Sequence, residues 1–149
     1  MELGTLERHI HIDASPEVVY EVVSRPEHIR EWWSDEASLD PTPGAVGEIS
    51  WHDGPTETLT VVDADPPRRF SFRWVAPEGA AATDTNSLLV TFELTASNGG
   101  TQLHLVETGF REKGWETAVL EEQYHDHETG WDHFLPRLRD RAIAVGADR

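Results

Sequence analysis

The sequence contains no cysteine, a single lysine (Lys113) and no long apolar run. Without cysteine, disulfides, thiolate catalysis and cysteine-ligated metal sites are excluded. A membrane-spanning helix needs roughly 20 apolar residues, and no run approaches that length. Residues 1–8 lack the basic start and apolar stretch of a signal peptide. We therefore expect a cytoplasmic protein with no membrane partner.

Positive charge is scarce: 28 acidic residues face 12 basic ones, for a formal net charge of −16. A field of this sign repels phosphate backbones and anionic lipid surfaces, so nucleic acid is not an expected partner. The length of 149 residues, 38% of them apolar, predicts one domain over residues 1–149 with a sizeable core.

The first third of the chain predicts one strand and two short helices. Residues 5–13 alternate between apolar and polar side chains, which indicates a half-buried strand. Ser15 and Pro16 then form a typical helix start, with Ser15 as the N-cap. A second short helix is expected over residues 28–33, where it ends in a pair of tryptophans.

The middle of the chain, from about residue 47 to residue 110, indicates an antiparallel meander. Phe70, Phe72 and Trp74 alternate with polar residues and give the clearest strand. Residues 97–100, Ser-Asn-Gly-Gly, join two further strands and are typical of a tight hairpin. We expect residues 40–47 to form a loop.

After Gly114 the apolar period changes to steps of three and four, which predicts one amphipathic helix of about 25 to 30 residues. Gly130 and Pro136 lie inside it, and a bend is expected near Pro136. A curved antiparallel sheet wrapped around this helix would bury its apolar stripe and the inner face of the sheet together. The predicted fold class is therefore α+β.

Several motifs resemble the SRPBCC (START-related, helix-grip) superfamily, in the branch of homologues of the heat-shock-protein-90 ATPase activator. They are residues 10–20, residues 25–33, residues 65–70 followed by Trp74, residues 99–103, residues 107–110 and the pair Gly130-Trp131. The resemblance implies a curved antiparallel sheet gripping the long C-terminal helix, with two short helices after the first strand and a cavity between sheet and helix. Members bind hydrophobic ligands, a few catalyse cyclisations or hydrolyses, and the eukaryotic relatives assist a chaperone.

The alternation of the strands and the stripe of the helix predict which side chains line such a cavity. They are Trp51, Glu57, Leu59, Phe72, Trp74, Phe92, Leu105 and Glu107 from the strands, with Tyr124, His127, Trp131 and Leu135 from the helix. The alternative is that these residues fill an ordinary core. Glu57 and Glu107 share faces with apolar neighbours, so each must find a partner, take up a proton or lie at a strand end in water.

The histidines do not predict a metal site, and we expect no cofactor. On a helix His125 and His127 point about 200° apart, so they cannot share one ion. His9 and His11 could chelate from one strand face, but we expect that face to be solvated. No nucleophile elbow or phosphate-binding loop is present either.

Three functions follow as hypotheses. The first is a carrier or sensor of an apolar or amphipathic small molecule. The second is an enzyme that uses Glu57, Glu107, Tyr124 or His127 as general acid or base in the same cavity. The third is a chaperone-associated stress-response module with an exposed apolar patch. Trp32 and Trp33 either form a lid or subunit contact or pack under the sheet edge, and the chain is a monomer or a homodimer.

Overall fold

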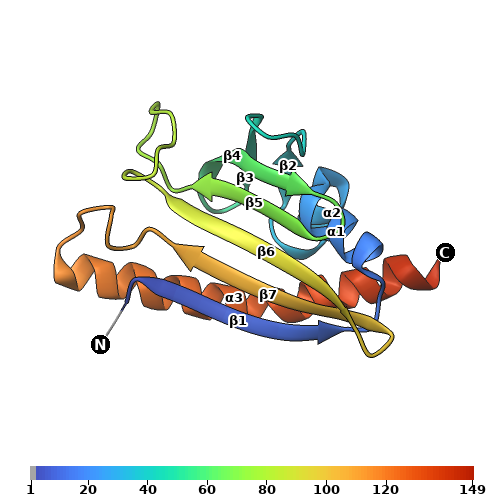
Figure 1. Cartoon of the computed structure of the whole chain (residues 1–149). Helices are drawn as coiled ribbons and strands as arrows, with labels where there is room; N and C mark the ends of the chain where they lie inside the picture. Colours follow the sequence, from blue (N-terminus) through green and yellow to red (C-terminus); the bar gives the residue numbers. More distant parts are fainter. Residues whose placement is uncertain (1–2) are drawn as a thin grey trace.

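The computed structural model describes residues 3–149. A seven-stranded antiparallel sheet curves along one long helix, and two short helices close one end of the space between them (Figure 1). The elements are β1 (Thr5–Ile12), α1 (Pro16–Ser24), α2 (Pro26–Trp32), β2 (Glu36–Ser38), β3 (Val46–Ser50), β4 (Thr56–Asp65), β5 (Arg69–Trp74), β6 (Leu88–Ser97), β7 (Gly100–Thr108) and α3 (Thr117–Ala147). The strand order is β1-β7-β6-β5-β4-β3-β2. This arrangement confirms the helix-grip prediction.

Local sequence explains the ends of several elements. The Ser15 side chain accepts a hydrogen bond from the Val18 backbone N–H at 3.3 Å, and Pro16 opens α1. Asn98 and Gly99 both have positive φ, 49° and 80°, as the two central residues of a tight hairpin require. They connect β6 to β7 as predicted. Strand β2 was not predicted: residues 36–38 lie between the second predicted helix and the predicted loop over residues 40–47.

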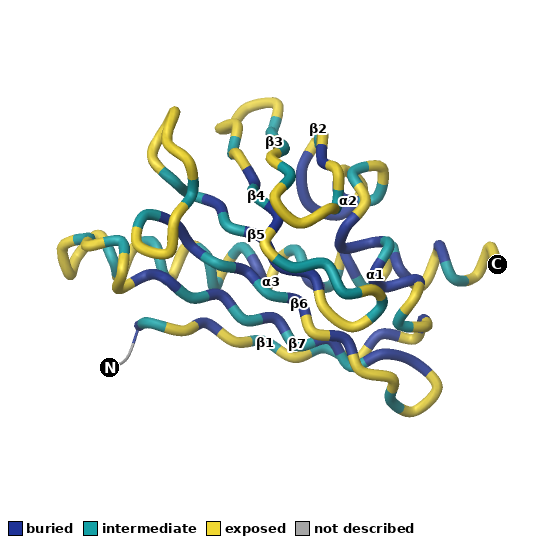
Figure 2. Tube along the Cα trace, turned by 45° about the horizontal axis from the view of Figure 1, so that its top comes forward, coloured by how far each residue is buried: buried dark blue, intermediate teal, exposed yellow. Residues whose placement is uncertain are grey.

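The core lies between the sheet and the helices. Along β6 and β7 burial alternates from residue to residue, so one face of the sheet turns inward and the other faces solvent (Figure 2). Trp32 and Trp33 are both buried, at 0% and 5% exposure, and stack at 5.5 Å between ring centroids. They pack inside the protein, and neither forms an exposed lid.

Helix α3 runs through Gly130 and Pro136 without interruption. Its buried residues are Trp131, Leu135, Leu138, Ala142 and Val145. The earlier part of the predicted stripe, from Leu120 to His127, is only half-buried. The first half of α3 is therefore less covered by the sheet, and the site described below lies where this half meets the buried second half. No described helix is long and apolar enough to cross a membrane.

Candidate functional site

A pocket of about 180 Å³ lies between the inner face of the sheet and the middle of α3. We call it the tryptophan pocket, because four of its eight lining residues are tryptophans. The lining consists of Trp33, Trp51, Trp74, Asp126, His127, Gly130, Trp131 and Phe134. Trp33 is central to these walls, with ring centroids 5.1 Å from Trp74 and 5.4 Å from Trp131. The rings supply flat apolar surface for a ligand.

A buried carboxylate fixes one wall of the tryptophan pocket. Glu107 on β7 is fully buried and accepts three hydrogen bonds: from Trp74 Nε1–H at 2.7 Å, from Trp131 Nε1–H at 2.9 Å and from His127 Nδ1 at 2.8 Å. Donors from β5 and from α3 thus meet on one acceptor. A carboxylate in an apolar interior is tolerated only with such partners. Glu107 therefore ties the sheet to the helix behind the pocket.

The same contact orients His127. A carboxylate can only accept a hydrogen bond, so the Nδ1 atom of His127 carries the proton that it donates to Glu107. Nε2 is then the ring nitrogen that can serve a ligand in the pocket. The His127 side chain is 12% exposed, so the ring is largely withdrawn from bulk water. The pair is a preoriented polar group in an otherwise aromatic wall.

Glu57 and Lys113 add charge near one side of this site. The register shift in β4 lies between Val61 and Asp63, so Glu57 keeps the same facing as Leu59. Partial burial raises the pKa of Glu57, and electrostatic interactions with His127 and Lys113 partly offset that rise. Burial lowers the pKa of Lys113, whose Nζ donates to the carbonyls of Val75 at 2.6 Å and Asn86 at 3.0 Å. Lys113 thereby links both ends of the 75–86 loop to the segment before α3.

Apart from Glu107 behind the pocket and Glu57 at its side, the predicted lining residues fall into three groups. Trp51, Trp74, His127 and Trp131 line the tryptophan pocket. Leu59, Phe72, Phe92, Leu105 and Leu135 are buried in the core and are not among its lining residues. Tyr124 instead packs on Phe110 at 5.2 Å and donates its hydroxyl hydrogen to the Thr5 carbonyl at 3.0 Å.

Sequence reasoning missed Asp126, Gly130 and Phe134 as lining residues and left the position of Trp33 open. A helix presents an arc to a pocket, and residues at three- and four-residue steps around His127 and Trp131 share that arc. This signal would have found Gly130 and Phe134. Asp126 is exposed at the edge of the pocket, where it adds negative charge.

Larger hollows lie elsewhere on the protein. One of about 390 Å³ lies beside Tyr20 and Pro66, and one of about 700 Å³ lies between β4 and residues 76–81. Glu57 lines the latter together with Glu48 and Thr58. Neither has the aromatic walls and fixed polar group that distinguish the tryptophan pocket, which is therefore our candidate site.

Comparison with known proteins identifies the family. A family model described as Activator of Hsp90 ATPase homolog 1-like protein matches residues 13–142. The chain belongs to this family. Comparison with curated proteins gave no match.

Solved structures of similar fold accompany the match to the Activator of Hsp90 ATPase homolog 1-like family. Protein MLL2253 from Mesorhizobium loti has a TM-score of 0.77 at 23% identity, over 94% of this chain and 97% of that one. The Aha1 dimer from Colwellia psychrerythraea has a TM-score of 0.71 at 19% identity, over 91% and 93%. DynU16, described as a putative protein in the dynemicin biosynthetic locus, has a TM-score of 0.74 at 21% identity, over 98% of this chain and 49% of DynU16. At these identities the structures support the fold alone.

Proposed function

We propose that the chain is a carrier or sensor that binds a neutral or cationic amphipathic aromatic molecule in the tryptophan pocket. The observation that carries the proposal is the pairing of aromatic walls with a single oriented polar group, His127, held by the buried Glu107. Such a site binds an apolar body by its rings and a hydroxyl or amine by the imidazole. The fold is one whose members commonly bind hydrophobic ligands.

The volume of the pocket limits the size of the ligand. A dry cavity of about 150 Å³ accommodates a benzene-sized molecule, and the tryptophan pocket measures about 180 Å³. It therefore suits a molecule of one or two rings, or the ring end of a longer one.

The charge around the pocket limits the charge of the ligand. Asp126 lies at its edge, Glu57 lies close enough to interact electrostatically with His127, and the chain carries a net charge of −16. Indole faces also attract cations. An anionic ligand would meet repulsion without a compensating arginine or lysine among the lining residues.

Binding of 2-naphthol, phenyltrimethylammonium and 2-naphthoate, measured by isothermal titration calorimetry, tests this proposal. We expect saturable binding of the first two, and binding of 2-naphthoate weaker by about tenfold or more because its carboxylate faces like charge. Failure of both 2-naphthol and phenyltrimethylammonium to bind, or preference for the anion, would contradict the proposal.

Gly130 offers a variant that blocks the pocket without harming the helix. A Cβ at Gly130 would meet no atom within 4 Å, and glycine is a poor helix former. Gly130→Leu should therefore abolish binding of 2-naphthol while keeping or raising thermal stability, and Gly130→Ala is the matched smaller change. Unchanged binding by Gly130→Leu would show that the ligand lies elsewhere.

A second candidate function is enzymatic, and the His127–Glu107 pair specifically favours it. A carboxylate behind an imidazole holds the tautomer in which Nε2 can accept a proton from a substrate or water. None of the eight lining residues has a hydroxyl or thiol, so the chemistry would be proton transfer or activation of water. Hydrolysis of 4-nitrophenyl acetate should then fall in His127→Gln and persist in His133→Gln, which changes an exposed histidine of α3. Equal rates in both variants would remove this candidate.

The described surface gives no support to a chaperone-docking module. It has four exposed large hydrophobic residues: Val46 and Val62, which lie near each other on β3 and β4, and Val119 and Ile143, which lie on distant turns of α3. So few exposed apolar residues are ordinary on a folded protein and do not make a large apolar patch.

A further inference from the structure

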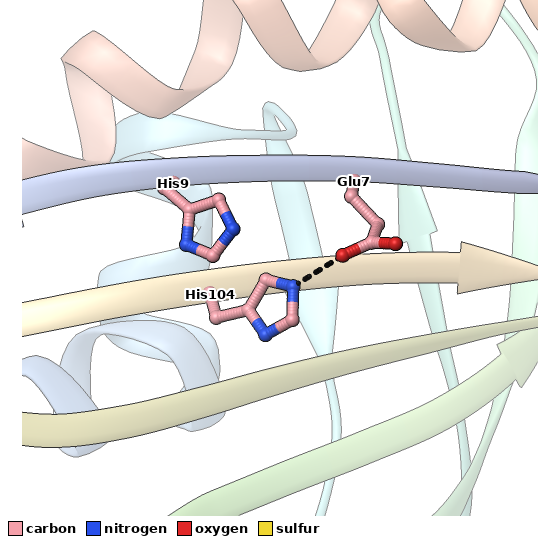
Figure 3. Close-up of side chains that lie close together, drawn as sticks. All are labelled: Glu7, His9 and His104. Atoms are coloured by element: carbon pink, nitrogen blue, oxygen red, sulfur yellow. Dashed lines mark hydrogen bonds and ion pairs between the residues drawn. The ribbon is translucent and has the colours of Figure 1, made fainter.

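The outer face of the sheet carries a second group of chemically active side chains. Strands β1 and β7 pair so that His9 lies directly opposite His104, and Glu7 lies two residues before His9 on the same face. Figure 3 shows the three side chains together, with both imidazole rings directing a nitrogen toward the Glu7 carboxylate. We call Glu7, His9 and His104 the outer histidine cluster.

The geometry of the outer histidine cluster is close to that of a metal site. One donor atom from each residue lies within 4.8 Å of the others, and His104 Nε2 is 2.9 Å from Glu7 Oε2. In a tetrahedral zinc site with bonds of about 2.0–2.1 Å, the donor atoms are about 3.3 Å apart. To bind one ion, the two imidazoles would have to turn out of their present stack so that a nitrogen lone pair of each ring points at the ion. The rings now stack at 4.2 Å with planes 5° apart, and the paired backbone positions of β1 and β7 keep the two side chains next to each other when the rings turn.

A further carboxylate is placed to orient His104. In β6, Glu93 pairs with His104 on the side opposite β1, and its Oε1 lies 3.5 Å from His104 Nδ1. Histidine ligands in proteins commonly direct their second ring nitrogen to a carboxylate, which fixes the ring and strengthens the donor atom. The row His9, His104 and Glu93 thus crosses three strands with the middle ring held between two carboxylates.

The charge environment favours a cation. Glu7 and Glu93 are both acidic, and the chain carries a net charge of −16. The next residue in the row is Arg69 on β5, whose guanidinium binds Asp63 at 2.7 Å. Arg8, next to Glu7 in sequence, binds Asp132 at 2.8 Å from the opposite face of β1. The nearest arginines are therefore engaged by other carboxylates.

We propose that Glu7, His9 and His104 form a binding site for a divalent transition-metal ion of the Zn²⁺ class on the outer face of the sheet. Two imidazoles and one carboxylate select Zn²⁺, Ni²⁺ or Cu²⁺ over Mg²⁺ and Ca²⁺, which prefer all-oxygen sites. Three protein ligands leave at least one position for water or an external ligand. The site is separate from the tryptophan pocket and does not depend on its function.

The sequence offered only His9 and His11 as a possible chelating pair, and it did not predict a metal site. His9 and His11 share a face of β1, but His11 lies opposite Gln102 and its Nε2 is 3.1 Å from Asp13 Oδ1. The partner of His9 comes from β7, 95 residues along the chain. Only the register of the sheet could reveal it.

Zn²⁺ titration of the full chain by isothermal titration calorimetry tests the proposal, with His11→Ala as the matched control on the same strand face. Because an acidic surface binds divalent cations weakly at many places, the test compares the Zn²⁺ affinities of the variants with each other. We expect one tight site that His9→Ala or His104→Ala weakens by more than about tenfold, and Glu93→Gln by about three- to tenfold. His11→Ala should bind as the wild type does, and excess Mg²⁺ should not compete.

Two further measurements show whether the variants remain folded and which histidines bind the ion. Circular dichroism should show that the variants remain folded, as expected for solvent-facing side chains. Zn²⁺-induced ¹⁵N shifts of the imidazoles should identify Nε2 of His104 as a ligand, with Nδ1 still protonated toward Glu93. Equal weakening by His11→Ala and His104→Ala, weak non-stoichiometric binding in all variants, or shifts confined to other histidines would overturn the proposal.

Discussion

Strand β7 contributes one member of a histidine–carboxylate pair to each face of the sheet. On the inner face Glu107 meets His127 at 2.8 Å, and on the outer face His104 meets Glu7 at 2.9 Å. The distances are nearly equal, but the side-chain exposures are not: 0% and 12% inside, 28% and 54% outside. Because the distances match and the exposures differ, comparing the two pairs shows how burial alone changes what such a contact contributes to the free energy of unfolding.

Burial makes the inner pair rigid and costly to alter. Glu107 has lost its water and depends on three N–H donors, so removing its charge or one donor leaves a buried polar group unsatisfied. The outer pair keeps water as an alternative partner, and its side chains can rearrange around an ion. The inner pair thus suits a fixed binding wall, and the outer pair suits metal capture.

The largest predicted effect is that of Glu107→Gln. The amide would point an NH₂ group at N–H donors in place of one carboxylate oxygen, so we expect a loss of about 3 kcal/mol in the free energy of unfolding. The matched outer change, Glu7→Gln, should cost less than about 0.5 kcal/mol because exposed ion pairs contribute little. Urea denaturation followed by circular dichroism measures both. Equal losses would show that burial is not the deciding difference.

Trp74→Phe should have the next largest effect, a loss of about 1–2 kcal/mol, because it removes one donor to Glu107 and a little packed volume. Trp32→Phe is the control: it also removes a buried indole donor, to the Val22 carbonyl at 2.8 Å, but outside the pocket. Both variants should lose stability by urea denaturation, and Trp74→Phe alone should weaken 2-naphthol binding. Weakened binding in Trp32→Phe as well would indicate a general loosening of the core.

Gly130→Ala should stabilise the protein by about 0.5–1 kcal/mol, because alanine is the better helix former and its Cβ meets open space at the pocket. The midpoint of thermal unfolding should therefore rise. Destabilisation would mean that the helix needs glycine at this position and that the space beside it is not free.

The smallest predicted effect concerns Glu57 and pH. Its pKa in the folded protein is raised, so its contribution to stability is fully present below the pKa of the unfolded chain and is lost as pH rises through the folded pKa. Glu57→Gln should thus gain stability relative to the wild type between about pH 4 and pH 6, by on the order of a few tenths of a kcal/mol because the side chain is half-exposed. Urea denaturation of both proteins across that pH range measures the sign of the stability difference. If Glu57→Gln instead lost stability relative to the wild type as pH rises, the raised pKa of Glu57 would be contradicted.

Local patterns predicted most of the fold, because strand alternation, the Ser15–Pro16 helix start and the Asn98–Gly99 turn are encoded by neighbouring residues. Strand β2 escaped because three residues are too few to show alternation. The inward direction of Glu107 followed from its parity with Leu103 and Leu105.

The contacts that make up the sites depend on longer-range geometry. The partners of Glu107 come from β5 and α3, so their meeting depends on how α3 is rotated against the sheet, which no local pattern specifies. His9 and His104 meet through the β1–β7 register in the same way. Sequence parity therefore predicts which face a side chain occupies, and tertiary packing decides which side chain it meets.

The most direct test of the tryptophan pocket is a 2-naphthol titration monitored through the six tryptophan indole N–H signals of the ¹⁵N-labelled protein. The account predicts saturable shifts of Trp33, Trp51, Trp74 and Trp131, which line the pocket, with Trp32 and Trp115 nearly unmoved. Dominant shifts of Trp32 or Trp115, or no shifts at all, would contradict it.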